Sequence, residues 1–482
     1  MLGGAFFAPY GKSIAQFNCL CILTEKPQKY TAFCPSGVFF CPNGNFYNPL
    51  DYFIRRIYNG TVTKPKESVN VNYKETLANA KTGLADLRDY AVDEIKAICS
   101  AYGPRPCGAQ SDIDAQKYML EGIKKYSDEA WRECFRVNPD AFMSFVPIAG
   151  ACMYGATAAN IIAANKCKKS ALGSLGLIGT ALSGIVGEFL LYKKPLDPFF
   201  KEKEGGNVIA VRKASGETKR RIILSGHTDS APEWTYTYKF GSNGSYVVLV
   251  PAIAGLLYTG ATAVVNLTSK NKKLKKAMSL GQLAFAPAYA GLFNFTNGKK
   301  YVEGANDDLS GCYVSAAVMK YLSDNDIRFE NTEIVCLLAG GEECGLRGSK
   351  AFFEAHPEYK NDGVETVFIG FDTIRDEEYM MIYEKDMTGT VPNDKKVCEL
   401  LKNAAAKCGK DVPVGAIPLG STDAAAASQA GIKAASFVAM DPAPADYYHT
   451  RRDTADILVP ETIEKTIEIA LQTVFDFDEK GI

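Results

Sequence analysis

Two adjacent glutamates, Glu342 and Glu343, stand just past an apolar segment in the stretch "EIVCLLAGGEECGLRGSKAF", residues 333–352. Residues 334–339 form an uninterrupted apolar run, which predicts a strand buried on both faces. Two glycines end the run, and a helix is expected from about Arg347. Carboxylates avoid burial unless a positive charge or a metal compensates them. The pair is therefore either a solvated turn or part of a metal site, and the rest of the chain favours the metal site.

Further residues of metal-binding type occur where apolar strands are expected to end or in acidic loops: His227 and Asp229 in "RRIILSGHTDS", Asp307 and Asp308 in "EGANDDLSG", Asp372 in "TVFIGFD" and His449 in "DYYHTRRDTAD". The third histidine of the chain, His356 in "FFEAHPEY", is interpreted as a surface residue. Open α/β sheets build their sites where strands end. This pattern therefore predicts a site at one edge of such a sheet.

These side chains suit a metal centre of a particular kind. Nitrogen and oxygen ligands without thiolate are typical of zinc, with manganese or cobalt as alternative occupants. Two histidines and at least three carboxylates, one of them shared, are enough for two metal ions about 3.5–4 Å apart, with one acid left over. Asp229 follows His227 closely, where a carboxylate that fixes the tautomer of a metal-bound histidine is expected.

The motifs HTD, GANDDLSG, EECGLRGS and YHTRRDT, together with the strand-end Asp372, occur in the order and spacing of the M28 family of co-catalytic zinc peptidases. These are aminopeptidases and related exopeptidases. The sequence resembles this family over residues 72–140, 200–245 and 299–482. Each motif alone is a weak signal, whereas their joint occurrence is highly specific.

The resemblance implies the following roles: Asp307 as the carboxylate that bridges two zinc ions, His227 and Asp372 as the other ligands of one ion, Glu343 and His449 as those of the second, Glu342 as the general base and Asp229 as the partner of His227. The family often has Ser-Asp-His in the region where this chain has "GSTDAAAASQAGI", residues 420–432. This departure touches no metal ligand, but it leaves the specificity pocket unassigned.

The function implied by the resemblance is that of a dinuclear zinc exopeptidase, an aminopeptidase that hydrolyses N-terminal peptide bonds with metal-activated water and Glu342 as the base. Its partners would be peptide or aminoacyl substrates. A glutaminyl-cyclase-like enzyme with a single zinc is an alternative on the same fold, and M20-type peptidases also use paired glutamates. A catalytically silent membrane scaffold or receptor on a peptidase fold is an alternative of another class, which the complete ligand set disfavours. The net charge of −1, from 54 basic and 55 acidic residues, gives no electrostatic case for nucleic acid.

Strands and helices are expected to alternate along much of the chain. Apolar and periodic segments predict strands at 207–211, 221–224, 335–338 and 367–371, and helices at 73–100, 111–123, 310–322, 395–407, 424–430 and 460–475. Such alternation argues for an α/β fold. Together with the resemblance, it predicts a three-layer sandwich around a mixed, mostly parallel sheet of the zinc exopeptidase type.

Four apolar stretches interrupt this pattern, at residues 141–165, 171–191, 246–269 and 277–298, and Glu188 is their one charged residue. Lysine-rich turns at 166–169 and 270–276 join them in pairs. Each stretch is long enough to cross a hydrocarbon core of roughly 30 Å as a helix. The pairs also resemble each other, in "VPIAGACMYGATAAN" from Val146 and "VPAIAGLLYTGATAVVN" from Val250. We expect a four-helix apolar bundle in a membrane; buried hairpins in a soluble protein are the alternative.

The expected organisation is a zinc peptidase domain at 71–140, 193–245 and 299–482, two inserted hairpins at 141–192 and 246–298 that make the chain a multi-pass membrane protein, and a segment of unknown role at 1–70. That segment shows no signal peptide, and its cysteine cluster lacks a regular zinc spacing. The positive charge of the lysine turns favours a cytoplasmic location for these turns. The segments at the other ends of the apolar stretches are also basic, so the sequence does not decide on which side of the membrane the catalytic domain lies. Because the connections are short, the bundle is expected beside the rim of the active site.

Overall fold

The computed structural model describes residues 73–443 and 445–482, which belong to one compact unit, Lys64–Ile482. The N-terminal segment expected at 1–70, with its cysteine cluster, lies outside the described residues.

Within these residues, nine strands form one mixed sheet in the order β1-β2-β6-β3-β7-β11-β8-β10, with β9 beside β8. The strands are β1 (Glu129–Val137), β2 (Lys203–Arg212), β3 (Arg220–His227), β6 (Thr332–Ala339), β7 (Glu365–Ile374), β8 (Met380–Asp386), β9 (Val391–Pro392), β10 (Val414–Ala416) and β11 (Lys433–Ala439). The four central strands β6, β3, β7 and β11 run parallel, while β1 and β2 form an antiparallel edge. A separate ribbon pairs β4 (Pro232–Trp234) with β5 (Thr296–Tyr301). The central strands are almost continuously apolar because helices bury both of their faces.

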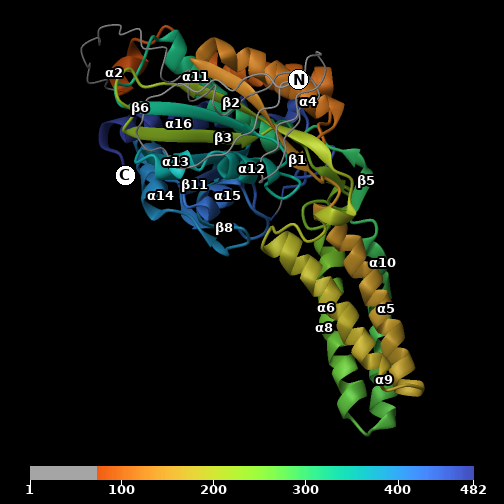
Figure 1. Cartoon of the computed structure of the whole chain (residues 1–482). Helices are drawn as coiled ribbons and strands as arrows, with labels where there is room; N and C mark the ends of the chain where they lie inside the picture. Colours follow the sequence, from red (N-terminus) through yellow and green to blue (C-terminus); the bar gives the residue numbers. More distant parts are fainter. Residues whose placement is uncertain (1–72, 444) are drawn as a thin grey trace, which may run out of the picture. The chain divides into compact units, whose positions relative to one another are not determined.

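Helices cover both faces of the sheet (Figure 1). One face carries α3 (Leu84–Tyr102), α4 (Gln110–Ile123), α11 (Ser310–Asp324), α14 (Lys395–Lys407) and α16 (Pro460–Lys480), and the other carries α12 (Arg347–Ala355), α13 (Glu358–Asn361) and α15 (Asp423–Ala430). Successive residues of β3 alternate between the two cores, with Ile222 and Leu224 in the first and Ile223 in the second. The predicted three-layer α/β sandwich around a mixed sheet is confirmed.

Two differences from the predicted elements have local causes. The helix expected over 73–100 is two helices, α2 (Tyr73–Ala78) and α3, because Gly83 is extended and its N–H bonds the Asp86 carboxylate at 2.9 Å. This bond begins a new helix at Leu84. The sequence patterns do not indicate β11, since its residues, KAASFVA, are rich in alanine and serine rather than in strand-forming types.

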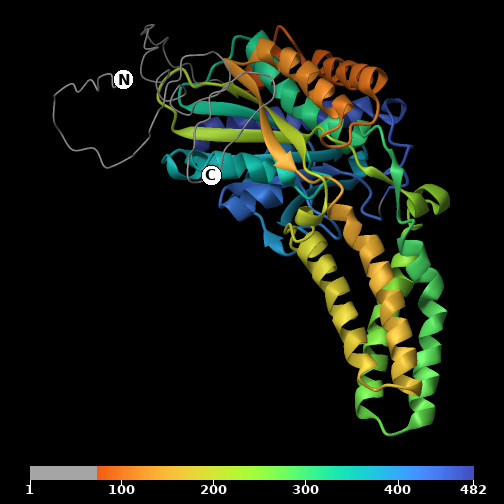
Figure 2. The same ribbon diagram turned by 45° about the vertical axis from the view of Figure 1, so that its right-hand side comes forward.

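The apolar stretches form a helical bundle beside the sheet domain (Figures 1 and 2). Its helices are α5 (Phe145–Asn165), α6 (Ser170–Gly184), α8 (Tyr246–Thr268), α9 (Lys272–Gly281) and α10 (Ala286–Leu292), with the short α7 (Thr235–Phe240) before α8. Among the described residues, three helices are long and apolar enough to cross a membrane, Phe142–Asn165, Ser170–Leu190 and Tyr246–Thr268. The fourth apolar stretch, 277–298, does not form one continuous α-helix. A 3-10 turn at Gln282–Phe285 separates α9 from α10, since Pro287 cannot donate the next helical hydrogen bond.

Polar side chains join the two related segments inside the bundle. Asn160 of α5 donates an amide N–H to the backbone oxygen of Thr259 in α8 at 3.0 Å, and Asn266 of α8 donates to the backbone oxygen of Asn160 at 3.0 Å. Both asparagines are fully buried, and each ends one of the related sequences. The glycines of the two Gly-Ala-Thr-Ala repeats face α6 instead. Helices α5 and α8 therefore meet through their asparagines rather than through these glycines.

Candidate metal centre

The parallel strands bring the predicted site residues to one edge of the sheet: β3 ends at His227, β7 carries Asp372, β6 leads through two glycines to Glu342 and Glu343, and β11 leads to the loop with His449. Because β6, β3, β7 and β11 are neighbours in this order, their carboxyl ends lie side by side. Asp307 comes from the turn Ala305–Leu309, which precedes α11 and packs against β3 and β7.

Asp307 lies between the two predicted histidines. Its Oδ1 atom is 3.1 Å from Nε2 of His227, and its Oδ2 atom is 3.1 Å from Nε2 of His449. The exposed fraction of these three residues is only 2% to 8%. One buried carboxylate thus presents one oxygen to each histidine, which is the arrangement that a ligand shared by two metal ions requires.

The other predicted ligands complete two groups around this carboxylate. His227, Asp307 and Asp372 offer ligand atoms within 4.8 Å of one another, and so do Asp307, Glu343 and His449. In the second group, Glu343 Oε1 lies 3.2 Å from Nε2 of His449. The structure therefore brings all five predicted ligands together.

The chemistry of this donor set fits a pair of metal ions. Donor atoms 3.1–3.2 Å apart match the separation of about 3.3 Å expected for nitrogen and oxygen atoms around one tetrahedral zinc ion. Asp307 Oδ2 and Glu343 Oε1 are buried, face the imidazole of His449 and have no hydrogen bond. Burial, with the neighbouring Asp307, raises the pKa of the Asp372 carboxyl to about 7. Bound cations would offset this accumulation of buried negative charge.

Asp229 connects two parts of the centre. Its Oδ1 atom accepts the backbone N–H of Glu342 at 3.0 Å and lies 3.7 Å from Nδ1 of His227. The backbone oxygen of Asp229 is closer to this nitrogen, at 3.2 Å, so the expected contact with His227 involves the main chain as well. Complete burial raises the pKa of Asp229 to about 8, against the opposing effect of His227. Glu342 itself lies 3.9 Å from Nε2 of His227 through its Oε2 atom.

Part of the sequence matches one peptidase family. Residues 288–474 match peptidase family M28. The match confirms the resemblance that the motifs gave. It includes Asp307, Glu342, Glu343, Asp372 and His449, whereas His227 and Asp229 precede it. No curated protein matches the chain.

Several solved structures are similar to the chain. The LapA aminopeptidase of Legionella pneumophila has a TM-score of 0.48 at 13% identity, over 87% of this chain and 78% of that one. An aminopeptidase from Aneurinibacillus sp. strain AM-1 has a TM-score of 0.48 at 15% identity, over 81% and 93% of the two chains. A glutaminyl cyclase of Porphyromonas gingivalis has a TM-score of 0.46 at 12% identity, over 81% and 98%. Likenesses at this level do not decide the activity of this chain.

Two further buried aspartates in the M28 region hold the turn that carries Asp307. Asp308 accepts three backbone N–H groups at 2.9–3.1 Å, those of His227, Gly311 and Thr373. Asp453 accepts the backbone N–H of Asp307 at 3.1 Å and both N–H groups of the preceding Asn306, from its backbone and its side chain. The motifs GANDDLSG and YHTRRDT contain these aspartates, but nothing in the sequence shows which backbone groups they bind.

Arg105, in the turn "YGPRPCG" before α4, is a positioning residue that the motifs do not indicate. Its side chain is fully buried, and the guanidinium donates to the backbone oxygens of Thr228 at 3.0 Å, Glu303 at 2.7 Å and Gly304 at 3.1 Å. Thr228 stands directly after His227, and Gly304 precedes the turn that carries Asp307. Arg105 therefore joins the two segments that supply the first histidine and the shared carboxylate.

The centre opens into a cleft lined mainly by aromatic and apolar side chains. The ends of the bundle helices nearest the sheet domain supply four of these side chains, Phe142, Met143, Phe189 and Tyr246. Other lining residues belong to the loop 417–422 and to the segments around Trp234 and Met440, together with residues of the centre itself. The ends of the bundle helices thus form part of the wall of the cleft.

Proposed function

We propose that the chain is a dinuclear zinc exopeptidase that removes the N-terminal residue of peptides, an aminopeptidase. The observation that carries this proposal is the position of Asp307, which turns one oxygen towards each of two histidines. A site for a single zinc ion does not need such a shared carboxylate. The match to a peptidase family supports hydrolysis of a peptide bond as the reaction.

The ligands divide into two sets: His227 and Asp372 for one zinc ion, Glu343 and His449 for the other, and Asp307 for both. Bound zinc would supply a water molecule with a pKa lowered towards about 7 and would polarise the carbonyl group of the substrate. His227, Asp307 and His449 are buried, and Asp372 and Glu343 are partly buried, so the surrounding strands restrict the orientation of these side chains.

Glu342 is the general base and general acid of the proposed reaction. It is the neighbour of a ligand, yet its Oε2 atom lies 3.9 Å from the histidine nitrogen, farther than the 3.1–3.2 Å of the ligand atoms. Its carboxylate would accept a proton from the attacking water and then donate that proton to the nitrogen of the departing amine as the C–N bond breaks. Asp229 accepts the backbone N–H of Glu342 and so fixes the backbone position from which the Glu342 side chain extends.

The cleft favours an apolar side chain on the residue that is removed. Apart from the metal centre and Glu342, its lining side chains carry no charge, and many are aromatic. Since a hydrophobic pocket discriminates by about 10–200-fold for each methylene group, leucine and phenylalanine derivatives should be cleaved faster than alanine derivatives. Acidic residues at the N-terminus should be poor substrates because the lining outside the metal centre offers no basic side chain to pair with them.

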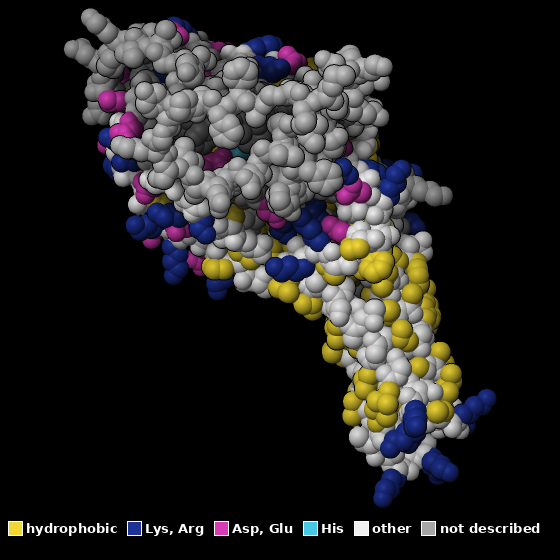
Figure 3. Space-filling model, in the orientation of Figure 1, with side chains coloured by type: hydrophobic (Ala, Val, Ile, Leu, Met, Phe, Trp, Pro, Cys, Tyr) yellow, Lys and Arg dark blue, Asp and Glu magenta, His cyan; other side chains and the backbone are white. Residues whose placement is uncertain are grey.

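We propose further that the bundle spans a membrane and holds the cleft near its surface. The outer faces of its helices expose large apolar side chains, such as Val247, Ile253 and Leu257, each at least 60% exposed (Figure 3). A contiguous apolar surface of this kind suits lipid better than water. Lysine residues gather at the turns that end the bundle (Figure 3). Peptides held at the membrane surface would therefore be the substrates nearest the cleft.

Metal analysis combined with a substrate screen tests the enzymatic proposal. We expect two zinc ions per purified chain, and hydrolysis of apolar aminoacyl and dipeptide substrates that is lost with a chelator and restored by zinc. One bound zinc ion together with cyclisation of N-terminal glutamine would favour the glutaminyl-cyclase-like alternative. Two bound zinc ions without turnover of any peptide would favour the silent scaffold or receptor.

A further inference from the structure

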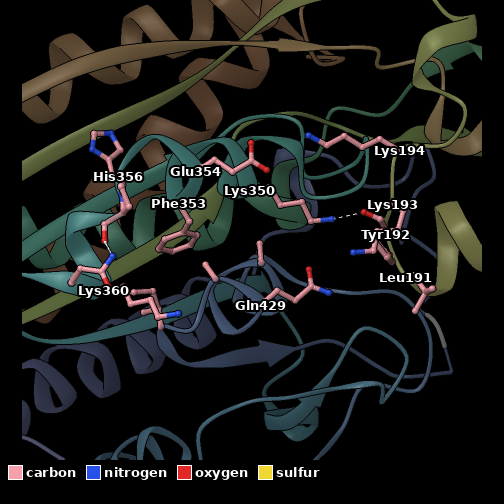
Figure 4. A pocket seen from close by; sticks show the side chains of 15 residues that line it. Leu191, Tyr192, Lys193, Lys194, Lys350, Phe353, Glu354, His356, Lys360 and Gln429 are labelled. Atoms are coloured by element: carbon pink, nitrogen blue, oxygen red, sulfur yellow. Dashed lines mark hydrogen bonds between the residues drawn. The ribbon is translucent and has the colours of Figure 1, made fainter. Parts of the chain in front are cut away.

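A second pocket lies on the sheet domain next to the segment that leaves the bundle after α6 (Figure 4). Its walls come from residues 191–194, from α12, from the segment with α13 and from α15. None of the residues of the metal centre lines it. Four of its lining residues are lysines, Lys193, Lys194, Lys350 and Lys360, whereas Glu354 is the acidic one.

Three of these lysines form a basic end of the pocket. Lys350 donates to the backbone oxygen of Tyr192 at 2.6 Å, beside Lys193 and Lys194 (Figure 4). Burial, and then the positive charges of Arg347, Lys194 and Lys193, lower the pKa of Lys350 to about 7. The nearby Glu354 acts in the opposite direction but does not outweigh these effects.

The two acids that flank the lysine pair in sequence form ion pairs with another residue. Glu188 and Asp197 lie on either side of the lysine segment in sequence, but both face Arg347, at 3.4 Å and 2.9 Å. In the described part of the chain, neither Lys193 nor Lys194 has an ion pair. An anion placed here would meet ammonium groups that are not already engaged with carboxylates.

The fold fixes the place of this lysine pair. Tyr192 is buried against Phe142 and Leu346, and the backbone N–H of Lys193 donates to Gly187 at 2.7 Å. Leu191 and Tyr192 separate the pair from the apolar span Ser170–Leu190, and Leu191 is 43% exposed. The basic end is therefore continuous with the apolar outer surface of the bundle.

We propose that this pocket binds the headgroup of an anionic phospholipid, with its phosphate among Lys193, Lys194 and Lys350 and its acyl chains along the outer surface of the bundle. Basic pockets beside membrane-spanning helices bind the headgroups of anionic lipids in this way. The proposal rests on the proposed membrane placement of the bundle. A free phosphate compound would meet the same lysines, but the adjoining apolar helix surface favours the lipid.

The test uses the full chain in lipid nanodiscs made of phosphatidylcholine and phosphatidylglycerol. Native mass spectrometry after mild detergent extraction should find phosphatidylglycerol retained on the wild type, and the double variant Lys193→Gln/Lys194→Gln should retain roughly tenfold less. The matched control is Lys272→Gln/Lys273→Gln in the opposite turn, which should retain as much as the wild type. Hydrolysis of a soluble aminoacyl substrate should be the same in all three proteins, so loss of lipid is distinguished from loss of the proposed catalytic activity.

A second measurement uses the wild-type protein and therefore still tests the proposal if the double variant fails to fold. Acetylation of wild-type Lys193, Lys194 and Lys350 should be slower in nanodiscs with phosphatidylglycerol than in nanodiscs of phosphatidylcholine alone. The lipid site would be overturned if the double variant retained as much phosphatidylglycerol as the wild type, or if the control variant lost as much as the double variant. Protection of these lysines by inorganic phosphate but not by phosphatidylglycerol would assign the pocket to a soluble anion. Recovery of the chain in water without detergent would overturn the membrane placement and this proposal with it.

Discussion

At the scale of the residue, the adjacent glutamates differ in what they face. Glu343 lies against the imidazole of His449, whereas Glu342 lies beside the first histidine and is held through its backbone by Asp229. Glu342→Gln should therefore keep both metal ions and lose activity by about 10²–10⁴-fold, since the general base is removed. Glu343→Gln should lower the zinc content. Zinc analysis and steady-state kinetics of both variants check this, and equal results for the two would refute the assigned roles.

The neighbouring aspartates allow a similar comparison. Asp307→Asn should weaken the binding of both metal ions, because its two oxygens face different histidines. Asp308→Asn should mainly destabilise the fold, by about 1–3 kcal/mol, because an amide cannot accept the three backbone N–H groups that the carboxylate accepts. Thermal unfolding and zinc titration of each variant separate the two effects. A larger loss of zinc affinity in Asp308→Asn would reverse the assignment of the bridging residue.

At the scale of the element, one histidine ties the edge strand β1 to the helical layer. His356 follows α12 and is not a surface residue, because its side chain is only 18% exposed. Its Nε2 atom lies 2.7 Å from Glu133 of β1, and its Nδ1 atom lies 3.0 Å from Glu358. Burial lowers the pKa of His356, but these two carboxylates outweigh burial and raise the pKa to about 9.

A pH dependence of stability follows from this raised pKa. The folded protein holds the proton up to about pH 9, whereas the unfolded chain releases it near pH 6.5. The stabilisation is therefore complete below about pH 6.5 and is lost as the pH rises through about 9. His356→Gln should lower the melting temperature at pH 6 by several degrees and have little effect at pH 10. Thermal unfolding of both proteins across this range checks it, and a difference that grows with pH would contradict the ion pairs.

At the scale of the whole molecule, the bundle should separate two sides of a membrane. Cys167 lies in the turn between α5 and α6, at the end of the bundle away from the sheet domain, and is the exposed one among the described cysteines. In sealed vesicles, a membrane-impermeant maleimide should label Cys167 only from the side on which an added protease leaves the sheet domain intact. The variant Cys167→Ser identifies the signal from this residue. Labelling and proteolysis from the same side would contradict a spanning bundle and favour a soluble helical hairpin.

The chemistry of the site and its approximate location in the chain can be read from residue types and their order. The apolar runs of β3, β6 and β7 and the polar residues that follow them are local features, so periodicity and residue type indicate them directly. The family motifs contain or accompany His227, Asp307, Glu343, Asp372 and His449 and so indicate that these residues act together. The apolar hairpins were visible for the same reason, since length and composition are properties of a continuous segment.

How these residues are held in place depends on contacts between distant parts of the chain. The bonds from Arg105 to Thr228 and Gly304 join residues far apart in the chain, and their acceptors are backbone oxygens, which every residue type possesses. The same holds for the three backbone donors of Asp308 and for the contact of Asn160 with α8. The pocket around Lys350 likewise depends on the packing of residues 191–194 against α12, α13 and α15. Residue types indicate which side chains can bind a metal ion. The groups that hold those side chains in position depend on the path of the whole chain.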